Sequence, residues 1–267
     1  MITLHDVGIT FNENTPDENK ALKHINLTIN KGDFITVIGS NGAGKSTLYN
    51  VISGNLNAGY GKITLETETG TRDITHEKEY KRAAYIGRIF QNPLLGTAGK
   101  MSLEDNMVIA SKKGFKGLRI SLNNKTRQYF RQQLSILNMG LEDRLSDNVE
   151  QFSGGQRQAL TLLMAVMSRP KLLLLDEHTA ALDPTNASII MNLTDKFAKE
   201  YGLTVMMITH NMQHALDYGN RILMMDAGEI IMDIGNSEKQ KLTMDDIVEK
   251  FRSIKKTSLN NDQMLLQ

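Results

Sequence analysis

Alternating apolar and polar residues predict strands near the N-terminus of the chain. In KHINLTI, Ile25, Leu27 and Ile29 alternate with polar residues, and Ile63 and Leu65 do the same in KITLE. Strict alternation is typical of a strand with one buried face, and such strands usually belong to antiparallel sheets.

A second pattern, the continuous apolar run, predicts strands of another kind. These runs are FITVI (34–38), LLLL (172–175) and TVMMI (204–208). Because they offer no polar face, they favour a parallel sheet that helices cover on both sides. Two further segments, 221–226 and 229–234, flank Ala227-Gly228 and predict a hairpin that closes the sheet.

Several segments between and after these strands show helical periodicity. The segments that we expect to be helical are 46–53, 103–110, 125–139, 156–168 and, near the C-terminus, 242–254. Ser102 with Asp105 looks like a capping box, and Gly140 is expected to stop the helix whose face carries Phe130, Leu134 and Leu137. Since residues from about 92 to 158 contain no convincing strand, we interpret them as an inserted helical subdomain.

Composition narrows the classes of function. The 267 residues are 40% apolar, and 31 basic against 30 acidic residues give a net charge of +1, so we expect no nucleic-acid partner. No cysteine is present, which excludes disulfides, thiolate zinc sites and thiol nucleophiles. The N-terminal residues predict no secretory signal, and no apolar run approaches the roughly 18–20 residues of a spanning helix. We therefore expect any membrane role to come through a partner.

The segment GSNGAGKS (39–46), directly after the apolar run FITVI, predicts a phosphate site. It fits G-x-x-x-x-G-K-[ST] between a strand and a helix, where backbone N–H groups and the helix N-terminus face an anion. Lys45 is expected to reach the β- and γ-phosphates, and the Ser46 hydroxyl to ligate Mg²⁺. The residues predicted to bind the nucleotide here are Ser40, Asn41, Gly42, Ala43, Gly44, Lys45, Ser46 and Thr47.

The run LLLLDE (172–177) places two carboxylates at the end of a buried strand. Asp176 is suited to hold the Mg²⁺ shell, and Glu177 to polarise an attacking water as general base. Many ordinary strands end in a turn that carries a carboxylate, so this motif alone is weak evidence. It becomes informative because it follows a phosphate loop in the same chain.

The segment FSGGQRQ (152–158) precedes a long helix. Ser153, Gly154 and Gly155 at that helix N-terminus would form a second anion site from a hydroxyl, bare N–H groups and the helix dipole. A serine N-cap with glycines in the turn gives the same pattern.

Together these motifs resemble the ATP-binding subunits of ABC transporters, over about residues 1–235. GSNGAGKST looks like the Walker A motif, LLLLDE the Walker B motif, and FSGGQ the family signature, with Phe152 where leucine is commoner. Three single residues match further family motifs in the expected order: Gln91 the Q-loop, Asp183 the D-loop and His210 the switch histidine.

The resemblance implies an α/β fold: a P-loop NTPase core with a mostly parallel sheet, an N-terminal antiparallel β subdomain and the inserted helical subdomain. It assigns residues 1–235 to the nucleotide-binding domain and leaves 236–267 as a C-terminal helical tail.

The family also implies a mechanism. Two copies pair head to tail, so that ATP lies between the Walker A loop of one copy and the Ser153–Gln156 segment of the other, with Asp183 alongside. Ser46, Gln91 and Asp176 would surround Mg²⁺, Glu177 would activate water, and His210 would steady the γ-phosphate. Phe11 is the candidate to stack on adenine; a buried phenylalanine at a strand end is the alternative.

Two features depart from the pattern or stand outside it. His178 follows the predicted catalytic glutamate where many family members carry proline, and no second ligand accompanies it to suggest a metal site. The basic segment 112–119 fits a solvated loop, or a contact with lipid headgroups or an acidic partner.

One nucleotide domain without a membrane span predicts a separate permease, as in bacterial importers. The segments 90–107, 113–119 and 176–184 together are similar to a subgroup thought to serve importers of amino acids, including aromatic ones. We therefore expect an ATPase at the cytoplasmic face of the membrane, working with permease subunits and an extracellular binding protein. The alternative is a permease-free ABC ATPase, as in iron–sulfur cluster assembly.

Overall fold

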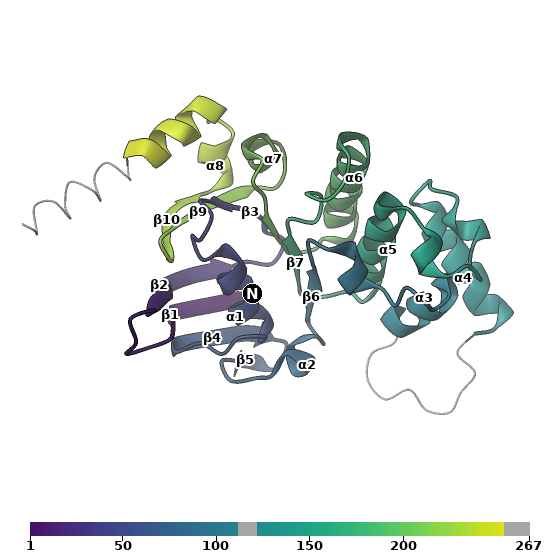
Figure 1. Ribbon diagram of the computed structural model, residues 1–267, viewed down its shortest axis with the longest axis horizontal. Helices are drawn as coiled ribbons and strands as arrows, with labels where there is room; N and C mark the ends of the chain where they lie inside the picture. The colour runs from purple at the N-terminus through teal and green to yellow at the C-terminus, as the bar shows by residue number, and fades with distance from the viewer. Residues whose placement is uncertain (112–121, 254–267) are drawn as a thin grey trace, which may run out of the picture.

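The computed structural model describes residues 1–111 and 122–253, which form two β-sheets with helices around them (Figure 1). The first sheet has the order β2-β1-β4-β5, from β1 (Ile2–Phe11), β2 (Asn19–Ile29), β4 (Tyr60–Thr67) and β5 (Gly70–Asp73). The second has the order β10-β9-β3-β8-β7-β6, from β3 (Phe34–Gly39), β6 (Ile86–Ile89), β7 (Leu172–Asp176), β8 (Val205–Ile208), β9 (Arg221–Asp226) and β10 (Glu229–Ile234).

The strand types follow the apolar patterns. All pairs in the first sheet are antiparallel, and Ile25, Leu27 and Ile29 are buried as their alternation predicts. In the second sheet β3, β6, β7, β8 and β9 run parallel, and only the β9–β10 hairpin is antiparallel. Ala227 (φ 46°) and Gly228 (φ 85°) both adopt the left-handed conformation that a two-residue hairpin turn requires. The predicted α/β class is confirmed.

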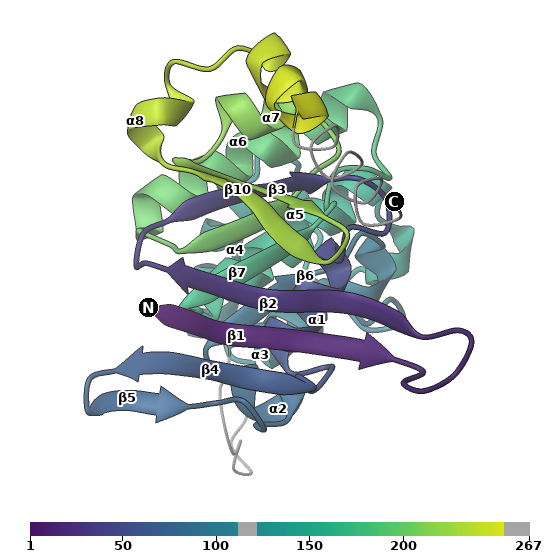
Figure 2. The ribbon, with the colours of Figure 1, turned by 90° about the vertical axis from the view of Figure 1, so that its left-hand side faces the viewer.

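The helices cover the sheets in layers. They are α1 (Lys45–Ser53), α2 (Glu79–Arg82), α3 (Leu103–Ser111), α4 (Asn124–Ser135), α5 (Gly154–Met167), α6 (Pro184–Tyr201), α7 (Met212–Asp217) and α8 (Asn236–Lys239). One apolar core joins α1 to facing residues of both sheets, which lie one above the other in Figure 2. Helices α3 to α6 share a second core with the opposite face of the parallel sheet.

The segment between β6 and β7 holds α3, α4, α5 and the short 3₁₀ turns Pro93–Gly96, Leu141–Asp143 and Val149–Gln151. Among its described residues the only β pairing is the isolated bridge between Ser102 and Asn148. It extends away from the sheets in Figure 1. One helix end was predicted wrongly: α4 stops at Ser135 and not at residue 139, because Asn138 (φ 53°) already takes the left-handed conformation, and Gly140 (φ 68°) begins the next 3₁₀ turn.

Helix α6 is an element that the sequence patterns did not predict, although its ends carry clear signals. Asp183 caps it by accepting a hydrogen bond from the Asn186 N–H at 3.0 Å, and Pro184 is its first residue. Gly202 (φ 58°) ends it in the left-handed conformation.

A buried arginine fixes the end of the phosphate-loop helix. Arg82 is fully buried and donates to the carbonyls of Val51 and Ile52, at 2.7 and 2.8 Å, in the last turn of α1, where the helix no longer supplies its regular N–H donors. The same guanidinium donates to the carbonyls of Ile74, Thr75 and Glu77. It therefore ties the helix to the first sheet.

The chain after β10 packs against the parallel sheet as far as it is described. Residues 244–253 are helical, and Ile247 is fully buried against Ile222 and Met224. The assignment of 236–267 as a separate tail stays a prediction, and residues 254–267 and the basic segment 112–119 lie outside the described residues. Within the ranges described, no helix has both the length and the apolar character to span a bilayer.

Candidate nucleotide site

The loop between β3 and α1 closes so tightly that glycine is required at both ends. A Cβ on Gly39 (φ 150°) would lie 2.1 Å from the carbonyl oxygen of Met225, and one on Gly44 (φ 95°) 2.5 Å from that of Ala21. Both contacts are with backbone, which cannot move aside. The two glycines therefore fix where the N–H groups of the loop and of the α1 N-terminus point.

Lys45 lies buried under this loop and supports it. Its Nζ donates to the carbonyl oxygens of Gly39 at 2.8 Å and Ser40 at 2.9 Å. Burial lowers the pKa of the ammonium group, while the carboxylates of Glu177 and Asp176 act to raise it. A phosphate in the loop would thus meet a cation whose only hydrogen-bond partners among the described residues are two neutral carbonyls.

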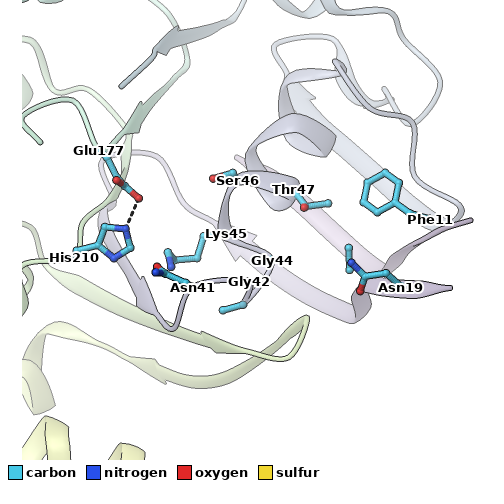
Figure 3. Close-up of a pocket in the computed structure, with 12 residues that line it drawn as sticks. Phe11, Asn19, Asn41, Gly42, Gly44, Lys45, Ser46, Thr47, Glu177 and His210 are labelled. Atoms are coloured by element: carbon cyan, nitrogen blue, oxygen red, sulfur yellow. Dashed lines mark ion pairs between the residues drawn. The ribbon is translucent and has the colours of Figure 1, made fainter. Parts of the chain in front are cut away.

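Around the loop lies a pocket of about 340 Å³. Figure 3 shows Phe11 and Asn19 at one end, Glu177 and His210 at the other, and the loop between them. The predicted residues that line it are Phe11, Asn41, Gly42, Ala43, Gly44, Lys45, Ser46, Thr47, Glu177 and His210. Ser40 does not line it, because its hydroxyl donates to Asp226 at 2.6 Å.

Glu177 and His210 meet at the carboxyl ends of the parallel strands β7 and β8. His210 Nε2 lies 2.6 Å from Glu177 Oε1, and the glutamate side chain is only 16% exposed. Glu177 also has a φ of 47°, a left-handed conformation that costs a non-glycine residue about 1–3 kcal/mol and is commonest at functional sites. The strained turn directs the carboxylate into the pocket beside the phosphate loop.

Asp176 makes a different contact, with the neighbouring strand. Its Oδ2 accepts a hydrogen bond from Arg88 Nη2 at 3.2 Å, and both side chains are mostly buried, with 14% and 11% exposed. Arg88 in turn donates to Asn50 on α1 at 2.6 Å. Asp176 thus lies behind the pocket rather than on its lining.

The residues predicted to ligate Mg²⁺ fit that ion in chemistry. Ser46, Asp176 and Gln91 offer a hydroxyl, a carboxylate and an amide oxygen, the hard donors that magnesium takes together with phosphate oxygens. The Ser46 hydroxyl accepts and donates no hydrogen bond within the described residues, so it is available. Gln91 is exposed and does not line the pocket. Among the residues described, no group of three histidine or carboxylate side chains could hold a metal ion without a further ligand.

The second predicted anion site lies at the N-terminus of α5. Ser153 caps the helix through a reciprocal pair: its Oγ accepts from the Gln156 N–H at 3.2 Å, and Gln156 Oε1 accepts from the Ser153 N–H at 3.1 Å. Ser153 and Gly154 are exposed, while a Cβ on Gly155 would lie 2.5 Å from Asn186 Oδ1. This N-terminus therefore packs beside Asp183 and α6, and it does not line the pocket of its own chain.

Comparison with known proteins agrees with this arrangement of strand, loop and helix. The family model described as ABC transporter matches residues 22–180. This chain belongs to the ABC transporter family. It is therefore an ATP-binding cassette, the ATP-hydrolysing component of that family.

Relatives of this ABC cassette match almost its whole length. A tyrosine transport ATP-binding protein of Clostridioides difficile is 40% identical over 94% of this chain and 98% of its own. A methionine import ATP-binding protein, MetN of Streptococcus agalactiae, is 33% identical over 92% of this chain and 68% of its own.

Solved cassettes share the fold of this ABC family member. A dimeric ATP-binding cassette in a post-hydrolysis state, bound to ADP and Pi, has a TM-score of 0.72 at 26% identity and covers 88% of this chain and 99% of its own. A cassette in its ADP conformation has a TM-score of 0.73 at 28% identity, over 94% and 98%.

Three residues at this ABC cassette's site carry no motif and were not predicted: Asn19 and Ala21, which line the pocket, and Arg88 behind it. Asn19 lines the pocket because it pairs with Phe11 across the β1–β2 hairpin. The turn residues between 12 and 18 signal that hairpin, but they do not fix its register. Arg88 was missed because its partner Asp176 is brought to it only by the parallel pairing of β6 and β7.

His178, the departure from the family pattern, is buried rather than ligand-binding. It is 2% exposed, and its Nε2 lies 3.1 Å from the Thr194 hydroxyl on α6. Burial, with His214 nearby, lowers its pKa to about 4, so the imidazole is neutral at physiological pH.

Proposed function

We propose that this ABC ATPase energises a bacterial importer of amino acids or similar small solutes, and that it works as a head-to-tail pair. The observation that carries the proposal is the separation, on one chain, of the two helix N-termini that are predicted to bind anions. The α1 N-terminus opens into the pocket, whereas Ser153 and Gly154 are exposed at the N-terminus of α5, outside it.

A second copy would bring the two together. The nucleotide would then lie between the phosphate loop of one copy and the Ser153–Gln156 segment of the other, with each copy completing the other's site. The dimeric arrangement of a similar cassette bound to ADP and Pi supports this assembly. The exposure of Ser153 and Gly154 leaves this N-terminus accessible to a second copy, as the assembly requires.

Within each pocket the side chains have separate tasks. The loop amides and Lys45 bind the β- and γ-phosphates, and Phe11 stacks on the base. Ser46, Gln91 and Asp176 would hold Mg²⁺, which would supply positive charge to neutralise the phosphates.

The hydrolytic step falls to the pair at the strand ends. Glu177 accepts the proton of the attacking water, and His210, 2.6 Å from that carboxylate, keeps it aligned and contacts the γ-phosphate. Phosphoryl transfer depends on positioning and charge neutralisation, so the loss of either group lowers the rate without altering the fold.

The permease would dock near the Gln91 segment and the helical insertion. Leu94 and Leu95, just after Gln91, are 54% and 66% exposed, and Ile109 on α3 is 52% exposed. Exposed large apolar side chains are common at protein–protein contacts, which supports docking at these segments. Docking there would hold the subunit at the cytoplasmic face, with an extracellular binding protein delivering the cargo.

The names of the relatives favour amino acids as cargo, since one is a tyrosine and the other a methionine transport component. The test is uptake of labelled tyrosine and methionine by cells that lack this chain, with the wild type or Lys45→Ala restored. We expect uptake to return only with the wild type, and a multi-span protein to co-purify with it. Co-purification with iron–sulfur scaffold proteins and unchanged uptake would favour the permease-free alternative.

A further inference from the structure

We propose that Arg88 is a positioning residue that orients the carboxylate of Asp176 for metal binding. The inference rests on the proposed role of Asp176 and deepens it. Arg88 Nη2 donates to Asp176 Oδ2 at 3.2 Å, while Oδ1 of that carboxylate accepts no hydrogen bond from the described residues. One oxygen is thus held and the other is left for a ligand.

The guanidinium is itself held by contacts on three sides. Nη1 donates to Asn50 Oδ1 at 2.6 Å, and the carbon of the guanidinium lies 4.6 Å from the centre of the Phe90 ring. Its strand, β6, pairs in parallel with β7, which ends in Asp176. Since the side chain is only 11% exposed, Arg88 has little freedom to leave its partner, unlike the arginine of a surface ion pair.

The contacts also join the two elements that carry the predicted metal ligands. Asn50 belongs to α1, the helix that begins with Lys45 and Ser46, and Asp176 ends β7. Arg88 connects them through one planar group that makes a hydrogen bond to each. It therefore fixes the carboxylate relative to the helix that supplies the Ser46 hydroxyl.

An alternative role for Arg88, as a counter-charge only, predicts the opposite change in metal affinity. If the guanidinium served only as a counter-charge, its removal would strengthen the attraction of Asp176 for a cation. If the guanidinium orients the carboxylate, its removal lowers the affinity for the metal, as happens when a metal ligand loses its outer hydrogen-bond partner. The sign of the change in metal affinity therefore separates the two roles.

The test measures binding of a non-hydrolysable ATP analogue to the full chain by calorimetry, from EDTA to saturating Mg²⁺. We expect Arg88→Met to raise the half-saturating Mg²⁺ concentration by about tenfold or more, and to leave analogue binding in EDTA unchanged. Arg88→Lys should show the same shift, because one ammonium cannot reproduce the two bonds of a planar fork. Asn50→Ala, which keeps the ion pair but frees the guanidinium, should give a smaller shift in the same direction.

The matched control is Arg127→Met, which breaks a bidentate pair with Glu104 on the helical insertion and should leave the Mg²⁺ dependence unchanged. An unchanged or lower half-saturating concentration in Arg88→Met would overturn the proposal, and so would full recovery in Arg88→Lys. Asp176→Asn separates the two levels of inference. If it too leaves the Mg²⁺ dependence unchanged, the role proposed for Asp176 fails, whereas a shift in Asp176→Asn alone refutes only the role of Arg88.

Discussion

Glu177→Gln tests the proposed general base with the smallest change in shape. The carboxylate lies 2.6 Å from His210 Nε2, and an amide of the same size can still form a hydrogen bond there. The left-handed turn at Glu177 is a property of the backbone and remains. We therefore expect the free energy of unfolding to change by less than about 1 kcal/mol.

The effect on hydrolysis should be much larger. General-base catalysis contributes about 10²–10⁴-fold to a rate, and its loss adds about 3–5 kcal/mol to the activation barrier. Binding of ATP should not weaken, because the substitution removes a negative charge from a pocket that receives phosphates. With binding intact and turnover blocked, the variant should accumulate as an ATP-bound dimer.

Phosphate release measures the rate, and gel filtration with and without ATP measures the dimer. The control is Glu200→Gln, an exposed glutamate at the end of α6 and outside the pocket, which should behave as the wild type in both assays. Hydrolysis by Glu177→Gln near the wild-type rate would end the assignment of the general base. Slow hydrolysis without any ATP-dependent dimer would instead contradict the paired arrangement.

Three further substitutions address binding, stability and pH. Phe11→Ala should weaken ATP binding about tenfold or more by calorimetry, since stacking on a base is worth about 1–3 kcal/mol; an unchanged affinity would leave the phenylalanine a structural residue. Arg82→Met should lower the free energy of unfolding in urea by about 3–5 kcal/mol, because five carbonyls lose the hydrogen bond of the guanidinium, and those of Ile52, Thr75 and Glu77 have no other donor among the described residues; a loss under about 1 kcal/mol would contradict that account. Burial lowers the pKa of His178 to about 4 from 6.5, so the unfolded chain binds more protons between these values. Stability should therefore fall as the pH drops from 6.5 towards 4, by up to about 3 kcal/mol, and His178→Gln should abolish this part of the pH dependence in denaturant titrations.

Local patterns predicted seven of the ten strands that the structure describes, but not β1, β5 or β6. Alternation marked the half-buried strands around Ile25 and Ile63, and continuous runs marked β3, β7 and β8. The end of α4 was predicted wrongly because Gly140 signals a left-handed residue without saying which element it ends. Helix α6 was not predicted, although Asp183-Pro184 and Gly202 mark its ends and its buried residues, among them Ile190, Leu193 and Phe197, recur at helical spacing.

Some residues of the site can be predicted from a local segment of the sequence, and others only from contacts between distant segments. The phosphate loop is one continuous segment, so its sequence contains nearly all that its geometry needs. The contacts of Asp176 with Arg88, and of Phe11 with Asn19, depend on which strands pair and in what register. These pairings cannot be read from local sequence patterns, because they are decided by packing across the whole domain.

In the structure described here, the charged groups of the site already have partners within the protein. Lys45 bonds to carbonyls of its own loop, Glu177 to His210, and Asp176 to Arg88. In the proposed mechanism a triphosphate replaces the first of these partners and draws His210 towards the γ-phosphate, while the buried pair behind the pocket persists. Binding would then exchange contacts at the exposed end of the site and keep the carboxylate of Asp176 fixed. This difference between the contacts that change and those that persist follows from burial, since the His210 side chain is 48% exposed and that of Arg88 only 11%.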